Sequence, residues 1–398
     1  MPDPVSEDFI PYHRPSIGLE EMEAVRQVLE SRWLTTGPVA QRFEREFAEF
    51  VGAKYALAVN SCTAALHLAL DAAGIGHGDE VLVPSYTFTA TAEVVTYLGA
   101  RPVLCDCLPG EFNIDPSDAE RRISEKTKAI IPVHIAGQPC NLAQLRKLAD
   151  QHGLHLIEDA AHALPATYQG KQIGSISEFT AFSFYATKTI TTAEGGMLTT
   201  DNEEYARRAA LMRLHGISGD AWKRYSAEGS WYYEVVDAGY KNNMPDLLAA
   251  LGLAQLRKAK DFHRRRCEIA SRYIEAFAEV SELQLPPQTE DHASHSWHLF
   301  ILRLATDQLS IGRNVFVGKL KQLGIGTSVH FIPLHLHPFY RQYYGYAPGD
   351  MPQAEDAYSR CFSLPIFPDM TEAEIERVIA GVVAITEQNR ARVFAGAA

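Results

Sequence analysis

Short apolar runs alternate with amphipathic stretches between residues 50 and 200. Runs such as KYALAV (54–59) and DEVLVP (79–84) have the length of strands, while TAALHLALDAA (63–73) and LAQLRKLADQH (142–152) have apolar residues at helical spacing. Strands that alternate with helices in this way indicate a largely parallel sheet with helices on both faces. The sequence therefore predicts an α/β fold.

A different pattern begins after GYKNNMPD (239–246). Apolar residues recur at helical spacing throughout 247–277, which predicts one long helix. Beyond it we expect a smaller α+β domain that contains HSWHLFILRL (295–304) and SVHFIPL (328–334) and ends in a helix at 371–388. The chain is thus predicted to carry a second, C-terminal unit with its own core.

The two expected domains are joined directly. Residues 18–31 and 39–50 also have helical patterns, and no repeat or low-complexity linker occurs along the chain. Domains without such a linker are expected to pack against each other. We predict a large domain at 16–255 and a small domain at 256–398, with residues 1–15 packed against the small one.

Charge and the N-terminal residues limit the classes of partner. The 398-residue chain has 49 acidic and 37 basic residues, a formal charge of −12, and no basic tract. This balance argues against nucleic acid and anionic membranes as partners. The start, MPDPVSEDFIPYHRP, does not resemble a secretory signal. No apolar run reaches the roughly 18 residues that a membrane span needs. We therefore expect a cytoplasmic protein.

Cysteines and histidines raise the question of a metal. Six cysteines in so long a chain do not form a disulfide framework. Cys105 and Cys107 lie on a predicted strand with no second pair nearby, so we interpret them as buried thiols. The C-terminal histidines lack a helical HExxH spacing and are expected to be structural or substrate-contact groups, not metal ligands: His295, His298, His330, His335 and His337.

NSCTAALHLAL (60–70) places small polar residues between a strand and a helix. Thr63 and the amides that follow it would lie at the helix N-terminus, which binds phosphate through free N–H groups and the helix dipole. The alternative is that Ser61 or Thr63 simply caps the helix. No GxGxxG or GxxxxGK[ST] motif occurs, so the common nucleotide-binding signatures are missing.

LHLIEDAAHA (154–163) ends an apolar strand with two carboxylates. Asp159 falls at the carboxyl end of this strand, where parallel-sheet enzymes hold ligand-facing groups. An acid there can keep a ring nitrogen protonated. The alternative is that Asp159 caps the next helix.

FSFYATKTITTAEGGML (182–198) carries Ser183 and Lys188 before the turn formed by Gly195 and Gly196. A lysine in such a packed, aromatic setting loses solvation, which lowers its pKa and makes its amine a usable nucleophile. The alternative is an ordinary solvated lysine on the surface.

Together these motifs resemble one family. NSCTAALHLAL, VPSYTFTATAEVV (83–95), IEDAAHA (157–163), FSFYATKTITTAEGG and GYKNNMPDLLAALGL occur in the order and spacing of the DegT/DnrJ/EryC1/StrS sugar aminotransferases. These are pyridoxal-5′-phosphate (PLP) enzymes of the aspartate-aminotransferase fold, fold type I. The resemblance implies a large domain with a mixed, mostly parallel sheet and a smaller α+β C-terminal domain.

The resemblance also implies the roles of residues around the cofactor. Lys188 would be the Schiff-base lysine and Asp159 the partner of the pyridine nitrogen. Phe88 would stack on one face of the ring, with His162 near the ring hydroxyl or the opposite face. Thr63, Ala64 and Ser183 would hold the phosphate. Asn243 would reach the same site from a neighbouring subunit, so the resemblance also implies a homodimer with shared active sites.

By the same resemblance, the donor is L-glutamate or L-glutamine and the acceptor a nucleotide-linked keto-deoxy sugar, aminated at carbon-4. Three alternative acceptors stay open: carbon-3 of the sugar, an inosose and an aminohydroxybenzoate precursor. A further alternative is a non-catalytic regulator of the same fold. Relatives that dehydrate sugars carry histidine at the position of Lys188. Contacts to the sugar are expected from two segments: Trp33, Thr35 and Thr36 in the first, and His330 and His335 in the second.

Overall fold

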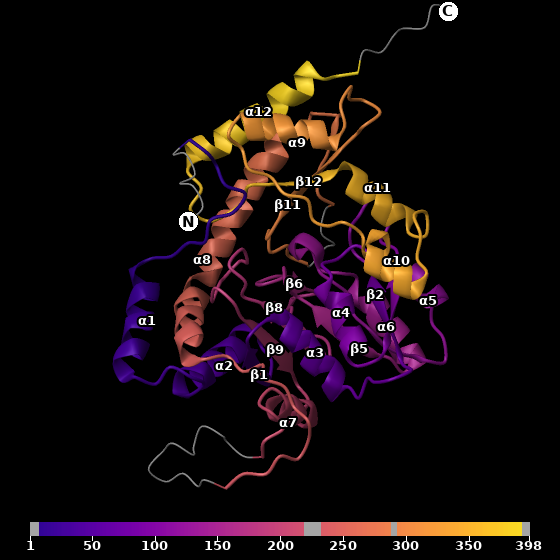
Figure 1. Cartoon of the computed structure of the whole chain (residues 1–398). Helices are drawn as coiled ribbons and strands as arrows, with labels where there is room; N and C mark the ends of the chain where they lie inside the picture. The colour runs from indigo at the N-terminus through magenta and orange to yellow at the C-terminus, as the bar shows by residue number, and fades with distance from the viewer. Residues whose placement is uncertain (1–7, 219–231, 288–292, 392–398) are drawn as a thin grey trace, which may run out of the picture.

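A seven-stranded sheet forms the centre of the larger part of the molecule (Figure 1). The computed structural model describes residues 8–218, 232–287 and 293–391. In spatial order the strands are β1 (Tyr55–Val59), β9 (Gly196–Thr200), β8 (Phe179–Ser183), β5 (His155–Asp159), β4 (Thr127–Ile130), β2 (Glu80–Pro84) and β3 (Arg101–Cys105).

Six strands of this sheet run in one direction, and β9 runs antiparallel to both of its neighbours, β1 and β8. The link between β8 and β9, residues 184–195, contains no helix, so the chain returns beside the strand it has just left. Gly196 lets the start of β9 lie close to the turn that follows β1, because a Cβ there would lie 2.6 Å from the amide nitrogen of Cys62. The predicted mixed, mostly parallel sheet is confirmed.

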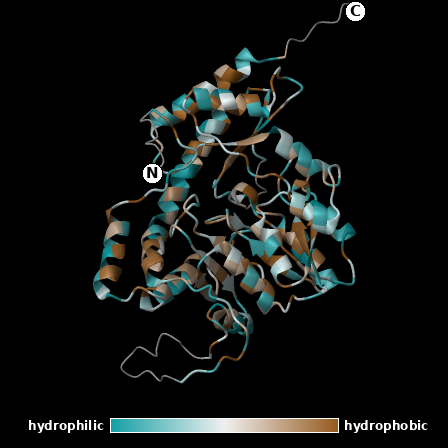
Figure 2. Ribbon diagram, viewed as in Figure 1, coloured by the Kyte–Doolittle hydropathy of each residue, from teal (hydrophilic) through white to brown (hydrophobic). Residues whose placement is uncertain are grey.

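Helices cover both faces of the sheet. Residues of α3 (Cys62–Ala72), α4 (Ala90–Tyr97) and α7 (Glu203–Met212) share one hydrophobic core with the strands. Residues of the following helices share the other core: α2 (Pro38–Val51), α5 (Pro116–Arg121), α6 (Leu142–His152) and α8 (Asp246–Phe277). Figure 2 shows hydrophilic and hydrophobic residues alternating along the enclosing helices, as expected when one face of a helix packs and the other meets solvent.

A small antiparallel sheet organises the C-terminal part. It consists of β10 (Leu283–Gln284), β11 (Phe300–Leu304) and β12 (Cys361–Leu364), which confirms the predicted smaller α+β unit. SVHFIPL forms no strand of this sheet; only a single bridge joins Ser328 to Ser363. The surrounding helices are α9 (Arg313–Gln322), α10 (Pro338–Tyr344), α11 (Pro352–Arg360) and α12 (Glu372–Gln388).

The long helix α8 connects the two parts. Its first turns pack beside α1 (Leu19–Ser31) and α2, and its later turns pack beside α12. The domain boundary proposed at 255/256 therefore falls inside one continuous helix. In the described segments no helix is both long and apolar enough to cross a membrane.

The N-terminal residues extend along the C-terminal part. Ile10 donates its amide to the carbonyl of Gly324 at 2.8 Å and accepts from the amide of Gly326 at 2.8 Å. Its side chain is buried in the core of that part. Ile10 thus packs on the C-terminal part, while residues 1–7 lie outside the described range, and the placement of residues 1–15 as a whole stays a prediction.

Candidate active site

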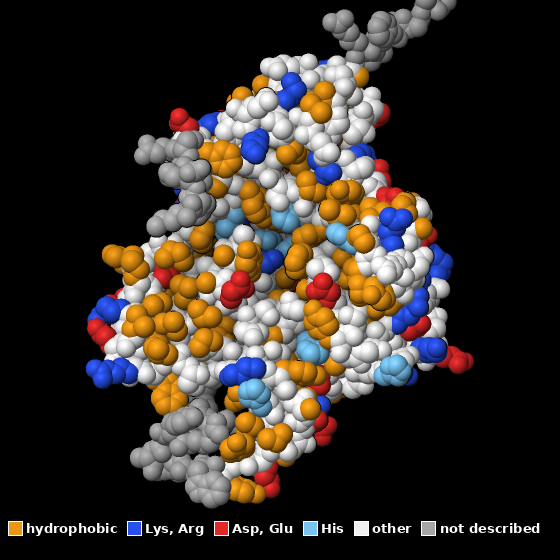
Figure 3. Space-filling model, in the orientation of Figure 1, with side chains coloured by type: hydrophobic (Ala, Val, Ile, Leu, Met, Phe, Trp, Pro, Cys, Tyr) orange, Lys and Arg blue, Asp and Glu red, His pale blue; other side chains and the backbone are white. Residues whose placement is uncertain are grey.

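A cavity of about 370 Å³ lies at the carboxyl ends of the strands, between the two parts of the molecule. Figure 3 shows histidine side chains gathered in the central hollow on this face. Seven of the residues singled out in the sequence line the cavity: Thr63, Phe88, Asp159, His162, Ser183, Lys188 and His330.

Sheet topology explains this convergence. Asp159 and Ser183 are the last residues of β5 and β8, which are adjacent and parallel. The carboxyl ends of parallel strands meet at one edge, which is where open α/β sheets bind ligands. The N-terminus of α3 reaches the same edge because β1 also runs in this direction and ends just before it.

Asp159 is buried, with 5% of its surface exposed. Its Oδ2 accepts a hydrogen bond of 2.8 Å from the Thr91 hydroxyl, and its Oδ1 accepts one of 3.1 Å from the Ala161 amide. Burial raises the pKa of Asp159, whereas these hydrogen bonds and the charge of Lys188 oppose the rise. The alternative that Asp159 caps a helix is wrong, because no helix stands between β5 and the next strand, β6 (Thr167–Tyr168).

Lys188 lies in the turn after β8, where its amide donates to the carbonyl of Tyr185 at 2.9 Å. Its surroundings exclude water, and this desolvation lowers the pKa of the amine to about 8, against the charges of Cys62 and Asp159. No ion pair to Lys188 is present among the described residues. An amine with this pKa is neutral, and so available as a nucleophile and base, in a far larger fraction of molecules near neutral pH than an ordinary lysine.

The N-terminus of α3 forms one wall of the cavity. Ser61 is the capping residue, since its hydroxyl accepts from the Ala64 amide at 3.1 Å. The Thr63 hydroxyl is therefore not needed as the cap, and the first amides of the helix have no partner within the helix. Ser183 lines the opposite strand end and accepts from the Tyr185 amide at 3.3 Å. The free amides at the start of α3 and the hydroxyls of Thr63 and Ser183 can donate hydrogen bonds to an anion.

Aromatic rings flank the cavity. Phe88 is 60% exposed and lies 6.0 Å from Phe331, measured between ring centres. The His162 ring stacks on Phe331 at 5.9 Å with an angle of 18° between the planes. Its Nδ1 accepts from the Ala136 amide at 3.3 Å. Burial and the charge of Lys188 hold the pKa of His162 well below its usual value. His162 is thus neutral, with its proton on Nε2.

Comparison with known proteins identifies the family. A profile of the DegT/DnrJ/EryC1/StrS aminotransferase family matches residues 15–383. The chain belongs to this family. Uncharacterized protein MJ1066 of Methanocaldococcus jannaschii is 51% identical over 97% of the chain and 100% of that protein. Spore coat polysaccharide biosynthesis protein SpsC of Bacillus subtilis is 50% identical over 94% of the chain and 96% of that protein.

Among solved structures, the PMP form of the putative sugar aminotransferase Spr1654 from Streptococcus pneumoniae matches with a TM-score of 0.90 and 34% identity. The match covers 95% of this chain and 99% of that one. The PLP form of the same protein matches with a TM-score of 0.89. The family, the fold type, the enzyme class and the cofactor predicted from sequence are confirmed at this level.

The cavity of this aminotransferase fits PLP in the chemistry of its donor set. A carboxylate, Asp159, is available to a ring nitrogen, and an amine of lowered pKa, Lys188, is available to an aldehyde. Phe88 and His162 offer rings to an aromatic system. The helix N-terminus with Thr63 offers donors to a phosphate. The role of each residue stays a prediction.

The two histidines expected to contact the sugar have different environments in this aminotransferase. His330 lines the cavity, with Nδ1 2.9 Å from the Ser363 hydroxyl and Nε2 3.5 Å from the Tyr12 hydroxyl. His335 has no exposed surface, and its Nδ1 and Nε2 lie 2.7 Å from the Ser85 hydroxyl and 3.0 Å from Glu355 Oε1. The structure therefore does not bring His335 to the cavity, because both of its nitrogens have partners within the chain.

The other predicted substrate and cofactor contacts lie outside this cavity in the single chain. Asn243 donates to the Thr36 hydroxyl at 2.6 Å, and the Trp33 indole donates to the Thr36 carbonyl at 3.3 Å. The Thr35 carbonyl accepts from the amide of Asp246 at 3.2 Å. These residues form one cluster at the start of α8. The Ala64 amide is used by the Ser61 cap.

Further residues line the cavity. Among them are Tyr12, Thr91 and Phe331, which the sequence analysis did not predict as contacts, and His298, which it left as either a structural or a substrate-contact group. Thr91 follows Phe88 by three positions in VPSYTFTATAEVV, and this helical spacing could have indicated it. Tyr12, His298 and Phe331 arrive from segments distant in sequence, and no local pattern signals their approach. In the described residues no group of three or more histidines, cysteines or acids is arranged to hold a metal.

Proposed function

We propose that this aminotransferase transfers an amino group from L-glutamate, or L-glutamine, to carbon-4 of a nucleotide-linked keto-deoxy sugar. The observation that carries the proposal is that Lys188, with its pKa lowered to about 8, and buried Asp159 line one cavity. The relatives named for spore coat polysaccharide biosynthesis and as a sugar aminotransferase support the acceptor class.

The lining of the cavity supports a sugar over a simple keto acid. Enzymes that use keto acids in both half-reactions grip the carboxylate with a bidentate arginine. Among the described residues that line the cavity there is no arginine. We assign the wall that faces the sugar to His330, with the Trp33 and Thr35 segment contributed by a partner subunit.

Bound PLP supplies an electron sink for the carbanion formed at the donor carbon. Asp159 keeps the proton on the ring nitrogen and so keeps that sink cationic. The amine of Lys188 carries a proton between the donor carbon and the cofactor. Phe88 and His162 orient the ring, and Thr63, Ser183 and the Ala64 region hold the phosphate.

We further propose a homodimer with shared active sites, in which Asn243 enters the cavity of the partner. Subunits with Lys188→Ala and subunits with Asn243→Ala should each be inactive or weak alone. When mixed, half of the sites in each heterodimer regain both intact residues, so activity returns. A fully active monomer in solution would contradict this arrangement.

The acceptor is tested by incubating the holoenzyme with glutamate and a panel of nucleotide-linked keto sugars, beside oxaloacetate and pyruvate. We expect an amino-sugar nucleotide, detected by mass, with the new amine at carbon-4 by NMR. Amination at carbon-3 or of an inosose would redirect the proposal within the family. Faster turnover of the keto acids with no amino-sugar product would overturn it.

A further inference from the structure

A buried cation lies close behind the active site. Arg266, on α8, has no exposed surface. Its Nη1 donates to the carbonyls of Trp297, His298 and Ile366 at 3.1, 3.3 and 2.8 Å. Its Nε and Nη2 are also buried but have no hydrogen-bond partner within the described chain. Leaving such donors unpaired in the interior costs free energy, so a partner is expected.

A small cavity of about 10 Å³ lies against Arg266. His13 and Lys188 also line it. Nε2 of His13 is a third buried polar atom without a partner in the described residues, while the backbone of Ala186 hydrogen-bonds to the same ring. Burial and the charge of Arg266 lower the pKa of His13 to about 3, so the ring is neutral and one nitrogen carries a free lone pair.

We propose that Arg266 and His13 bind one buried water molecule in this small cavity, and that Arg266 is a positioning residue for the active site. The volume matches a single water, which needs roughly 10–15 Å³ and two to four polar partners. The water oxygen accepts from Nε or Nη2 of Arg266, and one O–H donates to Nε2 of His13. A monovalent anion could accept from the arginine but could not donate to the neutral histidine.

Arg266 acts on the active site through two segments. The water ties it to His13, which is adjacent to Tyr12 in the chain, and Tyr12 lines the cofactor cavity. Its direct hydrogen bond holds the carbonyl of His298, whose ring lies 4.4 Å from the ring of His162. Both segments come from outside the large sheet, so fixing them defines the wall of the cavity opposite the strand ends.

The first test is a high-resolution crystal structure of the holoenzyme with a bromide soak. We expect one ordered peak within hydrogen-bond distance of an Arg266 donor and of His13 Nε2, with no anomalous bromide signal. An empty cavity, or bromide in it, would overturn the water site. This result does not depend on the donor or the acceptor, so it is separate from the proposed function.

The second test compares Arg266→Met and Arg266→Lys with Arg265→Met. Arg265 is the adjacent, more exposed arginine, which pairs with Glu268 and Glu372. Methionine removes the charge and all donors, while lysine keeps the charge but cannot reach three carbonyls and a water together. We expect both changes at 266 to shift the pH titration of the bound cofactor's absorbance and to lower kcat/KM by about tenfold to a hundredfold.

The Arg265→Met variant should match the parent enzyme in both measurements. If the Arg266→Met protein does not fold, the Arg266→Lys protein carries the test. A cofactor titration and a kcat/KM at the parental values in a folded Arg266 variant would refute the positioning role. The kinetic measurement rests on the proposed function, whereas the titration requires only that PLP binds.

Discussion

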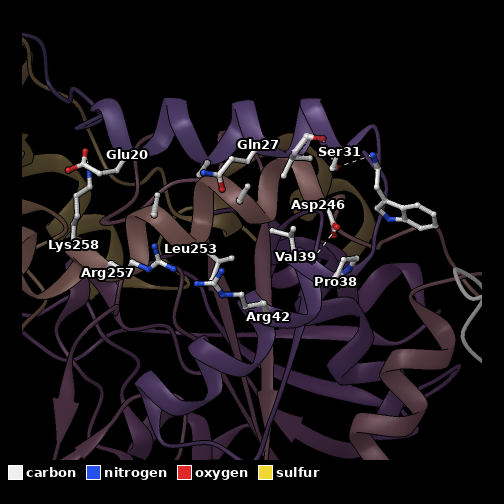
Figure 4. A pocket seen from close by; sticks show the side chains of 15 residues that line it. Glu20, Gln27, Ser31, Pro38, Val39, Arg42, Asp246, Leu253, Arg257 and Lys258 are labelled. Atoms are coloured by element: carbon white, nitrogen blue, oxygen red, sulfur yellow. Dashed lines mark hydrogen bonds and ion pairs between the residues drawn. The ribbon is translucent and has the colours of Figure 1, made fainter. Parts of the chain in front are cut away.

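Two cavities of similar size differ in whether the charged side chains that line them have ion-pair or hydrogen-bond partners. The cavity between α1, α2 and α8, shown in Figure 4, has a volume of about 450 Å³ and is larger than the cofactor cavity. Its Lys258 pairs with Glu21 at 2.7 Å, and its Asp246 accepts from the amides of Gly37, Val39 and Ala40 at the start of α2. Its Arg42 pairs with Glu46 at 2.6 Å.

In the cofactor cavity, by contrast, Lys188 has no ion-pair partner among the described residues and its pKa is strongly lowered. Burying an unpaired amine is unfavourable for folding. Such an amine is therefore found mainly in sites where it takes part in a reaction. In the helix cavity, by comparison, Glu21 and Asp246 are buried, but hydrogen bonds from Lys258 and from backbone amides offset the cost of burying these carboxylates. The comparison teaches that the electrostatic state of the lining, not the volume, marks the reactive cavity.

The largest effect is expected from removing the amine. Lys188→Ala should abolish transamination, because no other amine in the described lining can bond to the cofactor or carry the proton. The matched control is Arg42→Ala in the helix cavity, which should leave turnover at the parental level. Steady-state assays and borohydride reduction of the bound cofactor measure both. A Lys188→Ala protein with normal turnover would refute the distinction between the two cavities.

Asp159→Asn removes one charge at nearly constant size. We expect the half-reaction with glutamate to slow by about 10²- to 10³-fold, the usual effect of losing a preorganised electrostatic group. Stopped-flow absorbance of the cofactor measures the rate. An unchanged rate in the folded variant would rule out the role assigned to the carboxylate.

The pKa of Lys188 predicts a pH dependence. Because burial lowers the pKa from 10.5 to about 8, the amine is neutral above pH 8 and protonated below it. The rate at which apoenzyme takes up PLP covalently should therefore rise about tenfold for each pH unit between 6 and 7 and level off above 8. A rate that keeps rising toward pH 10, as for a free lysine side chain, would contradict the lowered pKa.

His335→Leu tests whether a buried histidine outside the cavity serves structure alone. Loss of the ring leaves the buried Ser85 hydroxyl without its 2.7 Å partner and leaves Glu355 Oε1 with only the Gly349 amide, which should destabilise the protein by about 1–3 kcal/mol. Activity per folded molecule should stay near that of the parent, while His330→Leu should raise the KM for the acceptor. Urea unfolding and kinetics separate the two outcomes; a raised acceptor KM for His335→Leu would restore it as a contact.

The smallest effect is expected in the helix cavity. Lys258→Met breaks the contact to buried Glu21, but the Gly18 amide and the Gln255 side chain still donate to that carboxylate, so the free energy of unfolding should change by only about 1 kcal/mol. Turnover should not change. A large loss of activity on this substitution would assign the helix cavity a role in the reaction.

Much of the fold could be predicted because local patterns determine it. The helix predicted at 142–152 is α6, Leu142–His152, where Asn141 caps the start and Gly153 adopts a left-handed conformation at the end. The position of β9 between β1 and β8 could not be predicted, since it depends on a direct return from β8 and on the close packing that Gly196 allows.

Some residues of the candidate site could likewise be predicted from local patterns, while others depend on tertiary packing. Asp159 and Ser183 end apolar strands, so their place at the sheet edge follows from sequence. His330 and His335 look alike in sequence, yet only the tertiary partners Ser85 and Glu355 distinguish them. Tyr12 and His298 reach the cavity through long-range packing that a local pattern does not encode.

The pairing of Ile10 with the segment 324–326 has a consequence for synthesis of the chain. The two segments of this contact are separated by more than 300 positions. At about 5–20 residues per second, the first segment waits on the order of 15 to 60 seconds on the ribosome before the second is made. The large sheet can pair its strands during that interval, but Tyr12, two residues after Ile10, cannot yet be held in place. A nascent chain therefore carries the sheet edge with Asp159 and Lys188 well before it carries the completed wall of the cavity.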